Sequence, residues 1–370
     1  MTLNVQLRPL SQIDARTEMA WSALASRAVE PNPFFEPIVA QRFARMAGLH
    51  VSVLTVEQGS DMLLCLPLRK SSLRWHRLPL QVWTGWDPLS APLVASEDTE
   101  AALRAAIEHL AGVRGPGFLV LDCVPSDGPL AAALESVNAR RRPAGLLSRT
   151  VRARPALYRR HDGNYTGSTL HGRHRGRQSN KRRNLEKRLG APLQLIDEKD
   201  SVEAIERLLA MELRGWKGRI GSAVLCRPDF ATYFRDVCAH FAQHDRMQVL
   251  SLQAAGTTVA MKADIRCGDK LFGLRTAYEE AFAAASPGVE LEIRAIEAFH
   301  KGGARYWDSC TNHAKNPQEW LWPDKRPIAR VVMSLSGMLG RISCSRAMVG
   351  MASRIAERRR VKQPSLHSTA

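Results

Sequence analysis

Ser286, Pro287 and Gly288 form a short segment whose residue types are suited to binding an anion. Serine is a favoured helix N-cap, because its hydroxyl accepts a hydrogen bond from a free amide of the first turn. Proline is tolerated at the first helical position, and glycine lets another group approach the backbone closely. A helix N-terminus carries free N–H groups and partial positive charge, so it suits a phosphate or a carboxylate. We predict a helix start here that contacts an anionic ligand group; the simpler alternative is a helix start alone.

Length and composition indicate a globular protein with a sizeable core. The chain has 370 residues, which favours two domains, and 45% of them are hydrophobic. No basic segment followed by an apolar run occurs at the start, and no stretch of about 18 apolar residues is present. The seven cysteines include no C-x-x-C pair, which argues against a disulfide framework or a zinc site. We therefore expect a cytoplasmic protein without a metal.

The positive charge of the chain is concentrated in two segments. The formal net charge is +17, yet residues 140–190 alone contain 16 Lys and Arg against two acids. Residues 331–370 add seven Lys and Arg against one acid. Clustered basic residues attract phosphates or anionic surfaces. Segments 171–188 and 341–362 are thus candidate contacts with tRNA or with the inner face of a membrane, although a solvated linker and tail would have the same composition.

The pattern of apolar residues predicts the elements that hold these residues in place. In the first half we expect strands at 3–8, 50–57, 61–69, 78–83 and 118–124, and helices at 17–27, 35–46 and 99–110. Residues 158–174 are predicted as a loop and 178–189 as a helix. In the second half we expect strands at 193–196, 247–254, 257–266, 271–278 and 304–310, and helices at 202–213, 228–241 and 286–299.

Both halves therefore have the same order, β-α-α-β-β-β-α-β, with 304–310 as the last strand of the chain. A three-strand meander followed by a helix and another strand is the order of GNAT-type acyltransferases. In that fold the N-terminus of this helix points at the pyrophosphate of the cofactor. Ser286-Pro287-Gly288 occupies that place in the second half, whereas residues 87–92 of the first half lack a comparable helix start. We expect one working half and one supporting half.

The second half also resembles a known family, the GNAT-related CelD/BcsL acetyltransferases named for cellulose biosynthesis. Five segments carry the resemblance: Glu212-Leu213-Arg214-Gly215-Trp216-Lys217-Gly218, Arg275-Thr276-Ala277-Tyr278-Glu279-Glu280, Ser286-Pro287-Gly288-Val289-Glu290-Leu291, Trp307-Asp308-Ser309-Cys310 and Trp322-Pro323-Asp324-Lys325-Arg326. The resemblance implies an α/β, tandem GNAT-like fold with mixed, largely antiparallel sheets flanked by helices. It also implies acyl transfer from acetyl-CoA or another acyl-CoA, with a loose link to exopolysaccharide synthesis. The usual Q/R-x-x-G-x-G/A phosphate loop is absent, and residues 283–288 occupy its place.

Acyl transfer needs a base for the acceptor and an acid for the leaving group. In a GNAT-type order Glu279 follows the third meander strand and is our candidate base, and Tyr278 is the candidate acid or orienting group. Asp308 ends the strand after the helix and is a candidate for orienting the acceptor. Ordinary structural roles are the alternative for each of the three.

Trp216 and Lys217 follow an amphipathic helix and precede a Gly-containing turn. The connection in which they lie borders the acceptor cleft in GNAT-type folds. Lys217 could hold an anionic group of the acceptor, and Trp216 could stack on a sugar or an acyl chain. A solvated lysine and a packed indole are the alternative.

We divide the chain into a degenerate GNAT-like half (1–150), a basic connector (151–190), a GNAT-like acyltransferase half (191–330) and a basic tail (331–370). The leading hypothesis is an acyl-CoA-dependent transferase acting on an amine or hydroxyl of a saccharide or small molecule. A Fem-like aminoacyltransferase using charged tRNA is the second hypothesis. A basic module that binds RNA or membranes without catalysis is the third, with residues 338–360 as an amphipathic basic helix.

Overall fold

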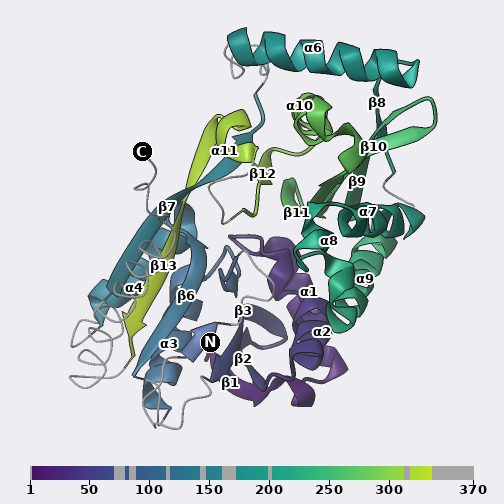
Figure 1. The fold of residues 1–370 in the computed structure, drawn as a ribbon. Coiled ribbons are helices and arrows are strands. Elements are labelled where there is room, and N and C mark those ends of the chain that lie inside the picture. Colours follow the sequence, from purple (N-terminus) through teal and green to yellow (C-terminus); the bar gives the residue numbers. More distant parts are fainter. Residues whose placement is uncertain are drawn as a thin grey trace, which may run out of the picture.

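The computed structural model of the chain describes residues 2–70, 80–82, 89–113, 117–141, 147–160, 172–198, 202–311 and 317–335. Its strands form a single 13-stranded sheet that is flanked by helices (Figure 1). The strand order is β1-β2-β3-β4-β6-β13-β7-β12-β11-β10-β9-β8, with β5 paired to β3. Most neighbouring strands are antiparallel, so the predicted α/β fold with a mixed, largely antiparallel sheet is confirmed.

The first half contains the predicted elements and several additional ones. In chain order they are β1 (Asn4–Pro9), η1 (Leu10–Gln12), α1 (Ala15–Arg27), η2 (Pro33–Phe35), α2 (Pro37–Ala47), β2 (Val51–Gln58), β3 (Asp61–Lys70), β4 (Leu80–Val82), β5 (Leu93–Val94), α3 (Thr99–Gly112), β6 (Phe118–Pro125), α4 (Gly128–Arg140) and β7 (Leu147–Tyr158). Helix α2 ends at Gly48, which takes the left-handed conformation with φ of 59°.

The second half repeats this order. Its elements are α6 (Gly172–Leu189), β8 (Gln194–Asp197), α7 (Val202–Arg214), α8 (Trp216–Arg219), η3 (Val224–Cys226), α9 (Pro228–Gln243), β9 (Met247–Ala254), β10 (Thr257–Cys267), β11 (Lys270–Tyr278), η4 (Glu280–Ala285), α10 (Pro287–Lys301), β12 (Tyr306–Asp308), α11 (Gln318–Leu321) and β13 (Asp324–Ser334). In each half the third meander strand pairs in parallel with the strand after the helix: β4 with β6, and β11 with β12. The shared order is therefore also a shared topology.

Three of the described strands were not predicted: the two-residue β5, which pairs with β3, and β7 and β13, which join the halves. The prediction that 304–310 is the last strand is wrong, because β13 follows it and lies between β6 and β7. Strand β7 starts inside the segment predicted as basic and irregular, and it pairs with β12 and β13. The two halves thus share one sheet. The proposed domain limits at 150 and 330 would each cut one of these strands.

Some predictions fall outside the described residues. These are most of the loop at 158–174 and the basic segment 341–362 with the helix expected at 338–360. Within the described ranges, no helix has the length and apolar character required to cross a membrane.

Side chains of β10 point alternately to the two faces of the sheet, and each face packs against a different core. Met261, Ala263 and Ile265 belong to the large core that includes α7 and α9. Ala260 belongs to the second core, which includes Leu291 and Ile296 of α10. Side chains alternate along a strand with a period of two, so Lys262 and Asp264 share the face of Ala260. Two charged residues therefore lie on a buried face under α10.

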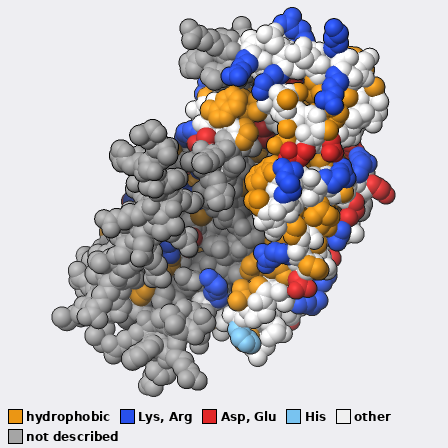
Figure 2. Space-filling model, viewed as in Figure 1, with side chains coloured by type: hydrophobic (Ala, Val, Ile, Leu, Met, Phe, Trp, Pro, Cys, Tyr) orange, Lys and Arg blue, Asp and Glu red, His pale blue; other side chains and the backbone are white. Residues whose placement is uncertain are grey.

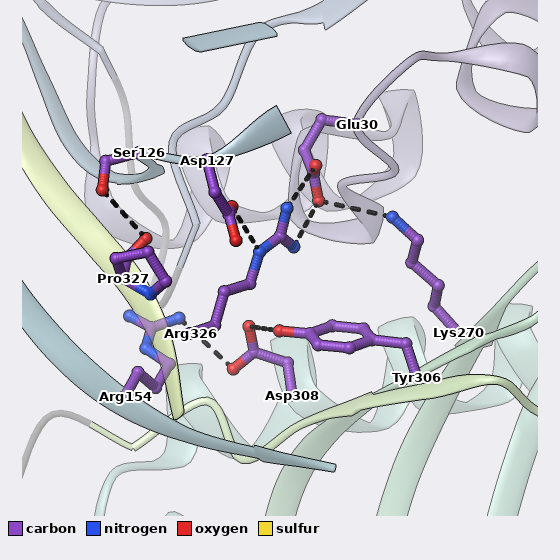
Figure 3. A network of polar contacts seen from close by, with 9 residues as sticks. All are labelled: Glu30, Ser126, Asp127, Arg154, Lys270, Tyr306, Asp308, Arg326 and Pro327. Atoms are coloured by element: carbon purple, nitrogen blue, oxygen red, sulfur yellow. Dashed lines mark hydrogen bonds and ion pairs between the residues drawn. The ribbon is translucent and has the colours of Figure 1, made fainter. Parts of the chain in front are cut away.

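A buried network of charges lies where the halves meet (Figure 3). The guanidinium of Arg326 on β13 donates two hydrogen bonds of 2.8 Å to the carboxylate of Glu30, and its Nε donates to Asp127 at 3.0 Å. Lys270 of β11 lies 3.6 Å from the same Glu30 carboxylate. Because Glu30 and Asp127 come from the first half, this network fixes the second half against it.

Candidate active site

A cavity of about 640 Å³ opens where strands β11 and β12 part. Their parallel pairing covers only three residue pairs and ends at Phe272 and Asp308. Beyond this point, residues 273–278 line one side of the cavity and residues 309–311 line another. Gly273 lies at the point of divergence, and a Cβ there would be 2.9 Å from the carbonyl oxygen of Ser309. Only glycine lets the two backbones approach this closely without a shift.

Lys262, Asp264 and Glu292 form a buried ionic cluster on the α10 side of the cavity. The ammonium of Lys262 donates to both carboxylate oxygens of Glu292, at 3.1 and 3.2 Å, and lies 3.8 Å from the ring centroid of Trp307. Asp264 Oδ1 accepts a hydrogen bond of 3.0 Å from Trp307 Nε1. Gln318 donates to Glu292 at 2.9 Å. This cluster holds one cation against two carboxylates.

The second carboxylate oxygen of Asp264 is buried and makes no hydrogen bond within the described part of the chain. It lies 3.9 Å from the ammonium of Lys262. Burial raises the pKa of Asp264 to about 7, because desolvation penalises the charged carboxylate more than the ammonium of Lys262 stabilises it. A buried indole Nε1, that of Trp322, also lacks a partner among the described residues and lines the same cavity. Both groups could hydrogen-bond to a ligand.

Glu212, Lys217 and Arg275 form a second cluster on the α7 side of the cavity. The ammonium of Lys217 donates to Glu212 Oε1 and to the Thr276 carbonyl, both at 2.9 Å. The guanidinium of Arg275 lies 3.5 Å from the same Glu212 oxygen, and Glu212 Oε2 accepts from Val224 N at 2.9 Å. Burial lowers the pKa of Lys217, and Glu212 opposes this shift. Here two cations face one carboxylate.

The N-terminus of α10 forms the mouth of the cavity. Helix α10 begins at Pro287 as predicted, and Ser286, Pro287 and Gly288 all line the cavity. The predicted capping by the Ser286 hydroxyl is wrong: Ser286 has φ of 54° and makes no side-chain cap. Its hydroxyl instead accepts a hydrogen bond of 2.7 Å from the Lys181 ammonium of α6. A lysine from the basic helix therefore lies at the start of α10.

Tyr278, Trp216 and Lys217 also line the cavity. Burial and the carboxylate of Glu280 raise the pKa of the Tyr278 phenol, so it stays protonated at neutral pH. Trp216 is 44% exposed. Its backbone N–H donates to Glu280 Oε1 at 2.9 Å, and this bond attaches the start of α8 to η4.

Glu279 and Asp308 are not among the residues that line the cavity. Glu279 accepts from the Arg214 guanidinium at 3.0 Å, which directs it toward α7. Asp308 is fully buried and accepts from the Tyr306 hydroxyl at 3.0 Å, the Cys310 amide at 2.8 Å and Arg154 at 3.4 Å (Figure 3). Both carboxylates therefore have ion-pair partners in the protein, Arg214 for Glu279 and Arg154 for Asp308.

Sequence reasoning did not identify Lys262, Asp264, Glu292, Glu212 or Arg275 as site residues. A signal for the first two exists: opposite charges at alternate positions of an otherwise apolar strand, Val-Ala-Met-Lys-Ala-Asp-Ile. Charged residues are rarely buried unless they are paired, so such a strand indicates a site or an ion pair. Among the described residues, no group of three or more His, Cys, Asp or Glu is arranged to hold a metal.

Comparison with known families identifies the part of the chain that contains this cavity. Residues 172–317 match the family model of the acetyltransferase (GNAT) domain. This segment is therefore similar in sequence to GNAT-type acyltransferase domains. All residues that line the cavity lie in this segment except Gln318 and Trp322. None of the curated proteins matches the sequence.

Solved structures share the fold over most of the chain at low sequence identity. The crystal structure of FemX has a TM-score of 0.55 and 9% identity, over 90% of this chain and 97% of its own. A protein of unknown function from Bacteroides thetaiotaomicron has a TM-score of 0.52 and 11% identity, over 90% and 100%. The C-terminal domain of a putative lysylphosphatidylglycerol synthetase from Agrobacterium fabrum has 0.50 and 12%, over 90% and 96%. Both halves and the strands that join them thus belong to one GNAT-like architecture.

Proposed function

We propose that this protein transfers an acyl group from an acyl-CoA thioester to a small acceptor bound in the cavity between β11 and β12. The observation that carries the proposal is the continuity of this cavity. It joins the N-terminus of α10 to the buried ionic cluster of Lys262, Asp264 and Glu292. An anion-binding helix end and a proton acceptor in one cavity are what direct acyl transfer requires.

The donor side of the cavity fits a phosphate-bearing molecule. The Gly288 amide makes no hydrogen bond within the described residues, and it belongs to the first turn of a 15-residue helix. The Lys181 ammonium adds a positive charge beside it. A pyrophosphate here would gain an amide donor, the helix dipole and a cation. The short helix η4 replaces the loop that usually holds CoA phosphates, so fewer backbone amides are available.

Proton transfer is assigned to Asp264 and Tyr278. The Asp264 carboxylate takes a proton from the attacking amine or hydroxyl, whose lone pair then forms a bond to the acyl carbon. The carbon–sulfur bond breaks, and the leaving thiolate takes a proton from the Tyr278 phenol, which is replenished from solvent. A base with a pKa of about 7 is well matched to this step at neutral pH.

A second donor, charged tRNA, is favoured by one specific observation. Helix α6 carries the exposed residues Arg177, Arg183, Lys187 and Arg188 beside the start of α10, and Lys and Arg side chains gather along this edge of the molecule (Figure 2). Such a basic surface suits a polyanion, which would make affinity fall steeply with salt. The resemblance to CelD/BcsL proteins supports a saccharide acceptor with either donor. Binding of anionic membranes through these basic residues would be a separate, non-catalytic role.

A thermal unfolding titration with CoA and acetyl-CoA tests the donor. A ligand at 100 times its Kd stabilises the folded state by about 2.7 kcal/mol, so the midpoint must rise. We expect a rise in the wild type that Gly288→Glu abolishes, because a carboxylate beside the helix start repels phosphates. Gly288→Ala is the matched control: its Cβ would meet Tyr278 at an ordinary 3.5 Å. No rise with either compound would overturn the CoA proposal, and salt-sensitive binding of charged tRNA would then support the second donor.

A further inference from the structure

The charged residues that line the cavity are segregated by sign. Of the six, Lys262, Asp264 and Glu292 have a formal excess of one negative charge. The other three are Glu212, Lys217 and Arg275, and they have a formal excess of one positive charge. Among the described residues the cavity therefore has an acidic end and a basic end, and the formal charges of these six side chains cancel.

The acidic end lies under α10, on the β10 face that carries Ala260. Asp264 is fully buried, and Glu292 and Lys262 are exposed by only 1% and 3%. Charges with so little water around them interact strongly, because the local dielectric constant is far below that of water. When Asp264 is ionised, the single ammonium of Lys262 cannot neutralise both carboxylates, so this end can then accept a second cation. Asp264 Oδ2, which accepts no hydrogen bond within the described part of the chain, is an acceptor for such a cation.

The basic end lies on the other side of the sheet, where α7 and α8 meet β11. Within the described residues, the Lys217 ammonium uses two of its three N–H donors for Glu212 and Thr276, which leaves one for a ligand. The side chains of Lys217 and Arg275 are both 21% exposed, so water or a ligand reaches them from the cavity. This end can accept an anion.

We infer that the acceptor is a small zwitterion, a primary amine that also carries a carboxylate or a phosphate. Its ammonium lies at Asp264 and Glu292, and its anionic group lies at Lys217 and Arg275. The separation of the two ends orients the molecule. The bound ammonium first releases one proton to solvent, and the resulting amine then loses a second proton to Asp264 as it attacks the acyl carbon. This inference rests on the proposed function, because it assigns the acceptor of the same reaction.

Matched probes test it on the full chain saturated with CoA. γ-Aminobutyrate carries both charges, whereas butylamine and butyrate each carry one. A series of ω-amino acids from glycine to ε-aminocaproate varies the distance between the ammonium and the carboxylate. Phosphoethanolamine replaces the carboxylate by a phosphate. Kd values come from thermal unfolding midpoints. We expect the best zwitterion to bind at least about tenfold more tightly than its matched amine and its matched acid. A preference for the phosphate compound would identify the anionic group.

Variants connect the preference to each end of the cavity. Asp264→Asn preserves the side-chain shape. It is expected to remove most of the difference in Kd between the zwitterion and butyrate. Glu292→Gln removes a charge from the same end and should act likewise if Asp264→Asn does not fold. Lys217→Gln should remove most of the difference in Kd between the zwitterion and butylamine. Binding of butylamine as tight as that of every zwitterion, or no response to any probe, would overturn the inference. A midpoint that still rises with CoA would then leave the proposed function standing, whereas no rise with CoA would count against that function.

Discussion

The ionisation of Asp264 should impose a measurable pH dependence on the stability of the fold. Burial raises the pKa of this carboxyl group from its ordinary 3.8 to about 7. The ammonium of Lys262 on β10 and the Trp307 indole of β12 oppose the shift, and the Glu292 carboxylate of α10 reinforces it. The perturbation we choose is Asp264→Asn, which keeps an acceptor for Trp307 but cannot ionise.

The sign of the effect follows from proton binding. Between about pH 4 and 7 the folded protein holds a proton on Asp264 that the unfolded chain has released. Stability from this group is therefore complete at low pH and is lost as the pH rises to the folded pKa. Each pH unit is worth about 1.4 kcal/mol, so the difference of roughly 3 units amounts to ~4 kcal/mol. About 3 kcal/mol of that falls between about pH 5 and 8.

Urea unfolding of the wild type and Asp264→Asn at about pH 5 and 8 measures this. Relative to the wild type, the free energy of unfolding of the variant should rise by ~3 kcal/mol between the two pH values. The control is Asp229→Asn, an exposed residue at the start of α9, which should follow the wild type at both. If the wild type and Asp264→Asn lose stability in parallel, the carboxyl does not titrate as argued, and its role as the base falls with it.

Two further predictions concern the frame around the cavity. Glu30→Gln breaks a buried, bidentate pair with Arg326 and should cost about 3 kcal/mol of unfolding free energy. Glu97→Gln, whose pair with Arg27 is exposed, should cost far less. Equal losses in urea unfolding would contradict this. Gly273→Ala forces a Cβ to 2.9 Å from the Ser309 carbonyl oxygen and should lower the free energy of unfolding by roughly 1–3 kcal/mol. The control is Gly303→Ala, whose Cβ meets nothing within 4 Å, and it should change this free energy by no more than about 0.5 kcal/mol. A neutral Gly273→Ala would show that β11 and β12 adjust freely.

Local pattern was sufficient to predict the elements of each half, because most of them show clear apolar periodicity. Phe230, Phe234, Val237 and Phe241 are buried on α9 as their spacing predicts. The meander of β9, β10 and β11 follows from alternation and from turn residues. These signals are carried by neighbouring residues, so they need no knowledge of distant contacts.

The joining strands could not be predicted in this way, because their stability comes from pairing over long sequence distances. In strand β7, Arg149 and Arg152 are exposed, and only residues 154–157 are buried. The sequence of this strand therefore has the composition of a basic linker. Strand β13 is buried at Ile328 and Val331–Met333, yet its partners β6 and β7 lie about 170 residues or more earlier. Burial set by distant partners overrides local composition.

The site was half predictable. Trp216, Lys217, Tyr278 and Gly288 line the cavity. They lie on loops and at element ends, and the order of elements along the sequence was enough to predict that these positions lie near the acyl site. Asp264 was missed because it occupies a position where alternation predicts an apolar side chain. Local rules fail at functional positions, where a residue is kept for its charge and other contacts stabilise it.

The insertion of β13 between β6 and β7 has a consequence for the order in which this protein can be made. During synthesis the first half emerges complete through β6 long before β13 leaves the ribosome. Until then β6 and β7 each present an open row of N–H and C=O groups, the kind of edge on which strands of other chains add. If the described elements fold in the order in which they are synthesised, β13 is the strand that covers both open edges when it is added.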